Sequence, residues 1–305
     1  MPVTIAKKTL ATIERCLRAD QGAKFRQLLK NNIMQCDDAF RGEEDPYRSH
    51  LGASGIGRDC PRQIWYDFRW VHQSKHVGKT ILLFNRGHLE EARFVSLLQM
   101  IGMQVWQVDG KGKQFRISHY GGHFGSAIDG VGKGCPDLPG EPINLEFKTS
   151  NTKGFKELEK NGCREAKPIH FIQQQTYMGK NKLNWSLYVV VCKETDELYA
   201  ELIPFEVEVY DRYIDRAVFI IESDTPPKGI SDTPGAWGCK FCEHKELCHN
   251  DGHALKNCRT CRYSKPMPDG TWVCRNYDLV LTKPMQKWEN KECEGYEVIP
   301  GLTQC

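Results

Sequence analysis

The sequence lacks a long hydrophobic run. Its longest apolar stretch, Leu187 to Cys192, is far shorter than the ~20 residues that a membrane-spanning helix needs. No apolar segment follows the basic start in the manner of a secretion signal. We therefore expect a cytoplasmic protein with no membrane partner.

A strong excess of charge is missing as well. The formal net charge of +3 is too small to indicate a nucleic-acid binder by itself, although residues 1–30 hold seven Lys and Arg against Glu14 and Asp20. The P-loop pattern G-x-x-x-x-G-K-[ST] does not occur, so the sequence contains no helicase motor. It also shows no flavin, nicotinamide or S-adenosylmethionine motif, which argues against a redox enzyme.

Cysteine, by contrast, is abundant: the 305 residues include 14 cysteines, and eight of these lie in the last third of the chain. Such clustering, with close C-x2-C pairs, is typical of metal sites rather than of a secreted disulfide framework. The segment after Trp237 is too poor in aliphatic residues to fold without metals. We expect one large domain over residues 1–250, its first 50 residues helical, and a Cys-rich, zinc-binding appendage over residues 251–305.

Hydrophobic periodicity predicts helices that surround a sheet. Short β-rich stretches separated by turns are expected as strands, and WSLYVVVCKE and LYAELIPFEV are expected to pair around Thr195 and Asp196. The fold class is therefore α/β, a central mixed β-sheet flanked by helices. Helices are predicted over residues 4–36, 60–71, 82–101, 169–178 and 209–223, and further strands in VWQV, FRIS, HFGSAIDGV and INLEFKTS.

Two of these strands carry candidate catalytic residues. Because strand side chains alternate, His123 and Asp129 share one face of HFGSAIDGV, while Glu146 and Lys148 share one face of INLEFKTS and Phe147 points into packing. The loop between them is rich enough in turn residues to let the strands pair, which would bring the acids and the lysine together. Neighbouring carboxylates favour Mg²⁺ or Mn²⁺, and the lysine can orient or deprotonate water and offset transition-state charge. An ordinary solvated strand is the competing interpretation.

Further polar residues extend this pattern in both directions. A predicted helix with two adjacent acids precedes it, and QQQTYM follows it with Gln173 and Tyr177 one helical turn apart. In this order the motifs resemble those of the RecB-type branch of the PD-(D/E)XK nuclease superfamily, over roughly residues 50–250. The resemblance implies a restriction-endonuclease-like core. It assigns catalysis or metal binding to Glu91, Asp129, Glu146, the Phe147 carbonyl, Lys148, Gln173 and Tyr177.

The acid on the early helix has two candidates. Glu91 shares a helical stripe with Val95 and should face inward, whereas Glu90 falls beside Arg93. We favour Glu91 and keep Glu90 as the alternative ligand. His123 is a further candidate metal ligand, because relatives within the superfamily use a histidine.

The cysteines form two groups. C-x2-C-x5-C with a lone upstream cysteine resembles the iron–sulfur staple of AddB-type helicase-nucleases and CRISPR adaptation nucleases, and it implies a structural [4Fe–4S] cluster, with zinc as the alternative. Its ligands would be Cys60, Cys239, Cys242 and Cys248. The second group resembles a small zinc ribbon or knuckle, with free thiols as the alternative. Its ligands would be Cys258, Cys261, Cys274 and Cys293, and His244, His249 or His253 could replace a thiolate in either site.

These patterns together predict a Mg²⁺- or Mn²⁺-dependent DNA exonuclease from a bacterium or phage. It would act on duplex ends or single strands in recombination, repair or replication. A helicase or a single-strand annealing protein would be its partner, because the sequence lacks a motor. The alternative is a non-catalytic single-stranded nucleic-acid binding protein with structural metal clusters. The acids favour the enzyme, because a pure binder gains nothing from carboxylates that face a phosphate backbone.

Overall fold

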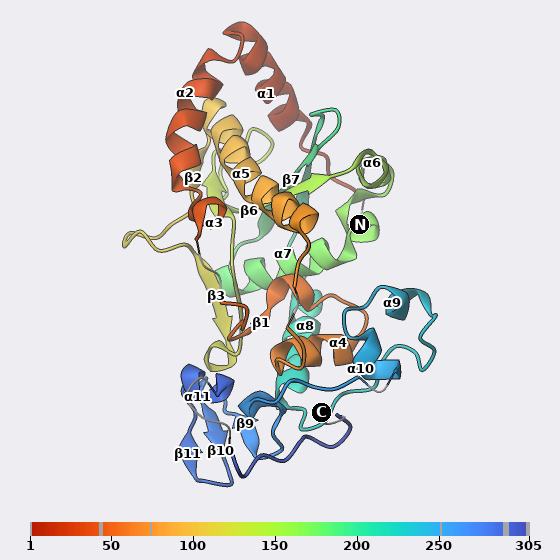
Figure 1. Cartoon of the computed structure of the whole chain (residues 1–305). Helices are drawn as coiled ribbons and strands as arrows, with labels where there is room; N and C mark the ends of the chain where they lie inside the picture. The colour runs from red at the N-terminus through yellow and green to blue at the C-terminus, as the bar shows by residue number, and fades with distance from the viewer. Residues whose placement is uncertain (1, 43–44, 74, 251, 289–292, 303–305) are drawn as a thin grey trace. The chain divides into compact units, whose positions relative to one another are not determined.

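The computed structural model describes residues 2–42, 45–73, 75–250, 252–288 and 293–302, and its chain divides into two compact units (Figure 1). Unit 1 comprises Met1–Glu44, His76–Ile117 and Ala127–Tyr210, and unit 2 comprises Asp45–Lys75, Ser118–Ser126 and Asp211–Cys305. This division differs from the one predicted from the sequence, which has a single boundary at residue 250. The segment that carries Cys60 belongs with the C-terminal third of the chain.

Unit 1 is built on a five-stranded mixed sheet. Its strands β6 and β7 run parallel, with Glu146 opposite Tyr188, and the other neighbours are antiparallel. The expected pairing of β7 with β8, and of the two strands that carry the acids, is confirmed. In spatial order the strands are β2 (Gln104–Trp106), β5 (Gly130–Lys133), β6 (Ile143–Ser150), β7 (Trp185–Cys192) and β8 (Leu198–Pro204).

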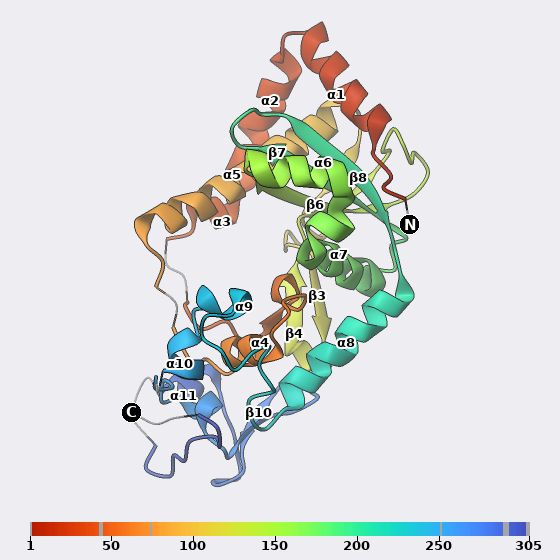
Figure 2. The same ribbon diagram turned by 90° about the vertical axis from the view of Figure 1, so that its right-hand side faces the viewer.

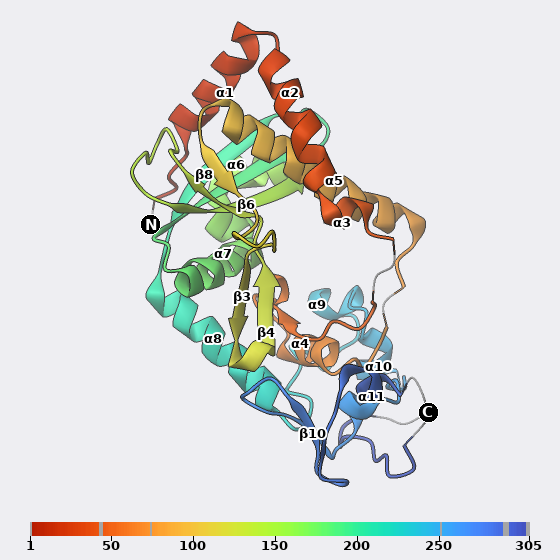
Figure 3. The same ribbon diagram turned by 90° about the vertical axis from the view of Figure 1, so that its left-hand side faces the viewer.

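Helices cover both faces of this sheet. Helix α5 lies on one face, and helices α6 and α7 lie on the opposite face (Figures 2 and 3). On the α5 face, Phe147 stacks on Phe94 with ring centroids 5.0 Å apart, so Phe147 points into packing as predicted and its neighbours Glu146 and Lys148 face α7. The helices of unit 1 are α1 (Lys7–Ala19), α2 (Ala23–Asn32), α3 (Asp37–Phe40), α5 (Gly78–Met100), α6 (Thr152–Ala166) and α7 (Pro168–Asn181).

The stretch HFGSAIDGV forms two strands, which corrects the prediction of one. Strand β4 (Phe124–Ala127) ends before Ile128, and β5 begins at Gly130 in a different sheet. Two local features accompany the break. The Asp129 carboxylate accepts the backbone N–H of Phe147 at 2.7 Å, in place of a ladder bond, and a Cβ at position 130 would lie 2.9 Å from the Trp106 carbonyl oxygen. The prediction that His123 and Asp129 share one strand face is therefore wrong.

Unit 2 contains one small sheet, most of a second and several short helices. Helix α4 (Pro61–Phe68) begins directly after Cys60, as predicted, and most of α8 (Val207–Glu222) belongs to this unit. One sheet has the order β1 (Leu51–Gly52), β4, β3 (Arg116–His119); the other has β11 (Leu279–Val280), β10 (Trp272–Cys274), β9 (Ser264–Pro266). The remaining helices are α9 (Trp237–Lys240), α10 (Lys245–His249) and α11 (Lys283–Lys287).

Two buried arginines join α4 to the C-terminal segment within unit 2. Arg259 donates to the carbonyl oxygens of Phe68 and Ser49, both at 2.9 Å, and its guanidinium lies 3.7 Å from the centroid of the Trp70 ring. Arg69 donates in turn to the Arg259 carbonyl at 3.3 Å. Such contacts offset the cost of burying charge. They explain why a segment near residue 60 packs with the cysteine-rich region.

None of the helices in the described ranges combines the length and the apolar character that crossing a membrane requires.

Candidate active site

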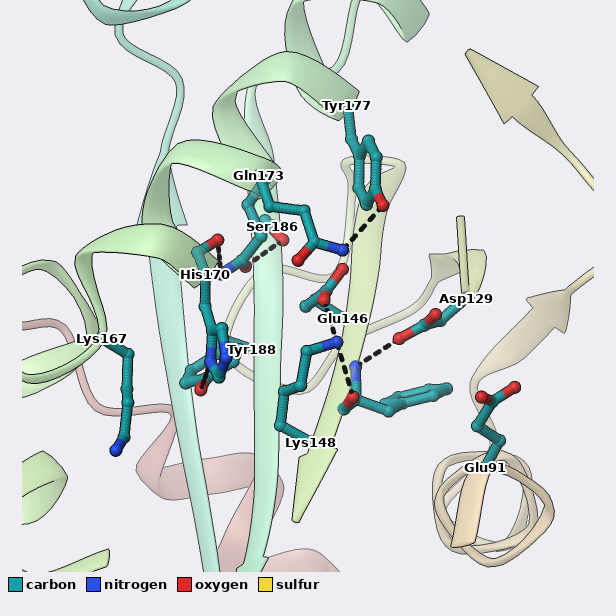
Figure 4. A network of polar contacts seen from close by, with 12 residues as sticks. Glu91, Asp129, Glu146, Lys148, Lys167, His170, Gln173, Tyr177, Ser186 and Tyr188 are labelled. Atoms are coloured by element: carbon teal, nitrogen blue, oxygen red, sulfur yellow. Dashed lines mark hydrogen bonds and ion pairs between the residues drawn. The ribbon is translucent and has the colours of Figure 1, made fainter. Parts of the chain in front are cut away.

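The candidate site centres on strand β6, which presents Glu146 and Lys148 toward α7 (Figure 4). The Lys148 ammonium donates to Oε1 of Glu146 in a short ion pair. It also donates to the Phe147 carbonyl oxygen at 3.1 Å. The Phe147 carbonyl, expected as a metal ligand, therefore already accepts a hydrogen bond from Lys148 in this structure.

The Glu146 carboxylate is fully buried, and its second oxygen, Oε2, accepts no hydrogen bond from any residue that the structure describes. Burial raises the pKa of Glu146 to about 8, and the negative charges of Asp129 and Glu91 act in the same direction, against the opposing charge of Lys148. An unpaired oxygen in a buried carboxylate is unfavourable unless a cation or a donor meets it. A bound cation would supply the partner that Oε2 of Glu146 lacks.

Two further carboxylates belong to the same electrostatic group. Asp129 stands immediately before β5, and Glu91 projects from α5 on the same side (Figure 4). Burial and then the charge of Asp129 raise the pKa of Glu91, while His88, whose Nδ1 lies 3.5 Å from Glu91 Oε1, opposes the shift. The structure therefore brings together the three acids that the sequence motifs singled out.

Glu90 has a different environment. Its carboxylate lies 3.3 Å from the Arg93 guanidinium, and the side chain is buried rather than solvated. Successive helical residues are about 100° apart around the axis, so only one of the two adjacent acids can face Asp129. Glu91 is the one whose pKa the charge of Asp129 raises, in addition to the larger effect of burial.

The three acids fit a divalent cation by their chemistry. Glu91, Asp129 and Glu146 outnumber Lys148, whose own pKa burial lowers and the charges of Glu146 and Asp129 raise, with a net rise. All their donor atoms are oxygens, which suit Mg²⁺ or Mn²⁺. No group of three or more His, Cys, Asp or Glu side chains in the described segments is already arranged to hold an ion.

Helix α7 closes the site behind Glu146. The Gln173 amide donates to the Tyr177 hydroxyl at 2.7 Å, and both side chains are buried. Figure 4 shows the Gln173 amide between Tyr177 and Glu146. Gln173 and Tyr177 lie one helical turn apart, as predicted. Because both side chains are buried, they support the site from behind and do not line an open surface.

The sequence interpretation missed His170, which lies one turn before Gln173 on the same helix. Its Nδ1 is 2.7 Å from the hydroxyl of Tyr188, the residue opposite Glu146 on β7. Burial lowers the pKa of His170 to about 3, and the charges of Lys148 and Lys167 add to this effect. The signal available in the sequence was the helical spacing in HFIQQQTY, which places this histidine on the stripe that faces the sheet.

His123 was predicted as a further metal ligand beside the carboxylates. It belongs to unit 2, where its Nε2 lies 3.1 Å from the Thr271 carbonyl oxygen. Its ring meets the edges of Phe68 and Trp272 at centroid distances of 5.9 and 5.7 Å, and burial lowers its pKa. The imidazole is therefore part of an aromatic core within unit 2.

The first cysteine group lines one pocket of unit 2, formed around Cys60, Cys239, Cys242 and Cys248. Burial raises the pKa values of Cys242 and Cys248, and the charge of neighbouring thiolates raises them further. A bound metal removes this penalty, because thiolates are the ligand form of cysteine. The structure thus gathers cysteines from two distant parts of the chain.

The second cysteine group lines a separate pocket of unit 2, formed around Cys258, Cys261, Cys274 and Cys293. Burial raises the pKa of Cys258 to about 11, and the other three cysteines of the group act in the same direction. The Trp288 indole N–H donates to the Cys258 sulfur at 3.2 Å. In both groups every thiol is free of disulfide bonds to the described residues. The two predicted groups are thus spatially separate.

Comparison with known proteins leaves the chain without a close relative. No family model and no curated protein matches it significantly. Among solved structures, SSO0001 matches at 16% identity and a TM-score of 0.37, covering 75% of this chain and 97% of its own. The alkaline exonuclease LHK-Exo from Laribacter hongkongensis matches at 17% identity and a TM-score of 0.41, covering 57% of this chain and 87% of its own. LHK-Exo in complex with dAMP matches at 18% identity and a TM-score of 0.43, covering 56% and 86%.

Proposed function

We propose that unit 1 is a metal-dependent deoxyribonuclease that hydrolyses phosphodiester bonds with Mg²⁺ or Mn²⁺. The observation that carries this proposal is the unpaired, buried Oε2 of Glu146 beside the charges of Asp129 and Glu91. A soluble fold gains no stability from such a group. A carboxylate cluster that awaits a cation is instead what metal-assisted hydrolysis requires.

The carboxylates of Glu91, Asp129 and Glu146 would hold the cation. When bound, it would polarise the phosphate and acidify a water molecule. Asp129 is already oriented for this task by the Phe147 N–H. Glu146 is oriented by Lys148, so each of these acids keeps one oxygen engaged and the other free to bind.

Lys148 would act as a cation rather than as a base. Its ion pair with Glu146, together with the charge of Asp129, raises its pKa, which keeps the ammonium protonated. A fixed ammonium beside the reacting phosphate offsets the negative charge that grows in the transition state. Gln173, Tyr177 and His170 would serve as positioning residues, because their buried contacts hold the α7 side of the site in place.

Unit 2 would supply structural metal sites. We propose a [4Fe–4S] cluster at Cys60, Cys239, Cys242 and Cys248 and a zinc ion at Cys258, Cys261, Cys274 and Cys293. The gathering of each set around its own pocket supports this assignment. Metal would then hold together segments that contain few aliphatic residues.

The preference for exonuclease action depends on the motif resemblance to RecB-type nucleases. The same resemblance underlies the assignment to DNA recombination, repair or replication in a bacterium or phage. It also underlies a helicase or single-strand annealing partner. DNA, as single strands or duplex ends, is the proposed substrate.

End-labelled single- and double-stranded DNA would test the function when incubated with the full chain and Mg²⁺, Mn²⁺ or EDTA. We expect cleavage with either metal and none in EDTA. A ladder that shortens from one end would establish exonuclease action and its direction, whereas internal fragments would indicate an endonuclease. Metal-independent binding without any cleavage would favour the non-catalytic single-stranded nucleic-acid binding protein instead.

A further inference from the structure

The first turns of α5 carry large apolar side chains that stay exposed. The exposed fractions are 55% for Ile81, 73% for Leu82 and 49% for Phe84, whereas the same helix is buried from Phe94 to Leu98. A helix that only faces solvent carries polar or charged residues on its open sides. Large apolar residues that are exposed together indicate a surface that binds another molecule.

Two of these residues lie on the side of α5 that leads to the candidate metal site. Successive helical residues turn by about 100° and rise by about 1.5 Å. Phe84 and Glu91, seven positions apart, are therefore within about 20° of each other around the axis and about 10 Å apart along it. Ile81 falls on the same side one turn earlier, and Leu82 falls on the opposite side. We call Ile81 and Phe84 the apolar stripe.

Neighbouring side chains leave the stripe accessible. The His76 ring is perpendicular to Phe84, with centroids 5.1 Å apart, and such a contact occupies at most one face of the Phe84 ring. Helix α3 lies beside this part of α5 (Figures 2 and 3), where the Asn85 amide donates to the Ala39 carbonyl oxygen at 2.7 Å. Asn85 is about 100° from Phe84 around the axis, so α3 covers an adjacent side of the helix.

The charge of this segment indicates the class of partner. Residues 75–89 include Lys75, Lys79 and Arg86 but no Asp or Glu. Apolar side chains in a positively charged segment suit unpaired nucleotides, which present base faces and phosphates together. A second copy of the chain is disfavoured, because a symmetric pairing places the same surface, and hence the same positive charges, against itself.

We propose that the apolar stripe binds unpaired bases of a DNA strand whose backbone passes the metal site, with Phe84 as the stacking platform. This inference rests on the proposed nuclease function and names its substrate class as single-stranded DNA, including the unpaired end of a duplex. Bases held about two helical turns from Glu91 fix the position of the strand relative to the cation. Phe84 is a substrate-binding residue and takes no part in bond cleavage.

The test measures the affinity of the full chain for labelled DNA by fluorescence anisotropy in EDTA. Three probes are compared: a single strand, an abasic strand of equal length that keeps the phosphates and lacks the bases, and a blunt duplex. Phe84→Ala removes the ring, Phe84→Trp keeps an aromatic platform, and Ile81→Ala is a second variant of the stripe. Leu82→Ala is the matched control, because Leu82 is exposed on the opposite side of the same helix. Thermal unfolding of each protein and metal-dependent cleavage by the parent are measured separately.

We expect Phe84→Ala to weaken binding of the single strand by about 5- to 150-fold, the range for stacking of one base on an aromatic side chain. Ile81→Ala should show a smaller loss, and Phe84→Trp and Leu82→Ala should bind the single strand like the parent. The abasic strand and the blunt duplex should bind equally well to the parent and to all four variants.

An unchanged single-strand affinity in Phe84→Ala would overturn the inference alone and would leave the stripe to a protein partner. An equal loss for the abasic strand, or an equal loss in Leu82→Ala, would also overturn it, because the effect would then depend neither on bases nor on this side of the helix. A parent that binds single strands through Phe84 but cleaves no DNA with Mg²⁺ or Mn²⁺ would overturn the nuclease proposal and support the stripe as a single-strand site.

Discussion

Glu90 and Glu91 show how the surroundings of a single carboxylate decide its role. The two are adjacent and chemically identical, yet one pairs with Arg93 and the other is coupled to Asp129. Glu91→Gln should lower metal-dependent cleavage about 100-fold or more, the size seen when one transition-state contact is lost. Glu90→Gln should stay within a few-fold of the parent. The two variants are compared by single-turnover cleavage of end-labelled DNA at fixed Mn²⁺. A larger loss of cleavage in Glu90→Gln than in Glu91→Gln would contradict the assignment of Glu91.

His170 predicts how stability depends on pH. Its pKa is about 3 in the fold and ~6.5 in an unfolded chain, so between these values the unfolded state binds the extra proton. This contribution to stability is present above pH ~6.5 and is lost as the pH falls. The parent should therefore lose up to about 1.4 kcal/mol more per pH unit than His170→Gln in this window.

Urea unfolding at several pH values between 7.5 and 4.5, in EDTA, measures this difference. The comparison between parent and variant cancels the titration of the carboxylates, which both proteins share. Equal losses of unfolding free energy on acidification would show that His170 takes up its proton in the folded state without cost.

At the scale of elements, the break between β4 and β5 positions the site. Asp129 occupies the break, and Gly130 lets β5 approach the Trp106 carbonyl. Gly130→Ala should destabilise the protein by about 1–3 kcal/mol, the usual cost of overpacking, and should reduce cleavage by displacing Asp129. Gly140→Ala is the control in the loop before β6, where no described atom lies within 4 Å of the added Cβ. Thermal unfolding and cleavage are measured on both; similar behaviour of the two variants would contradict the packing argument.

The elements predicted correctly from the sequence are those with a strong local pattern. The alternation in INLEFKTS placed Glu146 and Lys148 on one face and Phe147 on the other, and β6 has this arrangement. Helix α6 was missed because its two glycines and many charges obscure a short apolar face of Phe155 and Leu158. The residues that form this apolar face lie close together in the sequence, whereas the strand that packs against it comes from another part of the chain.

Contacts made across the fold could not be read from the chain. At the split of HFGSAIDGV, the Asp129 side chain accepts a hydrogen bond from the Phe147 N–H, which lies outside that stretch. His170 was missed as a supporting residue for the same reason, because its partner Tyr188 comes from another element. A pattern within one segment identifies which side chains share a face, but it does not identify what that face meets.

At the scale of the whole molecule, the two kinds of site are divided between the units. The carboxylates lie in unit 1, and both cysteine groups lie in unit 2. If the proposed [4Fe–4S] cluster is present, the protein should be brown, and Cys60→Ala should bleach it. The variant should also expose the amides of α4 and α10 to hydrogen exchange, because one lost ligand frees the segments that the cluster would join. Strands β6 and β7 should keep their protection.

Cys36→Ala serves as the control, since Cys36 is a half-buried thiol of unit 1 that lines neither pocket. Hydrogen exchange followed by mass spectrometry resolves the two units in a single experiment. Loss of protection throughout β6 and β7 in Cys60→Ala would show that the cluster supports the entire molecule. Retention of full colour would contradict the assignment of Cys60.

The central claim is that Glu146 acts through a bound divalent cation in the hydrolysis of DNA. The most direct measurement is the Mn²⁺-dependent cleavage rate of Glu146→Gln, together with its affinity for the same DNA and its thermal unfolding. We predict a cleavage rate reduced by about 1,000-fold or more, in the upper range for loss of a group that acts on the transition state. DNA affinity should stay within a few-fold of the parent and the fold should be intact. Substantial metal-dependent cleavage by a folded Glu146→Gln would contradict the claim.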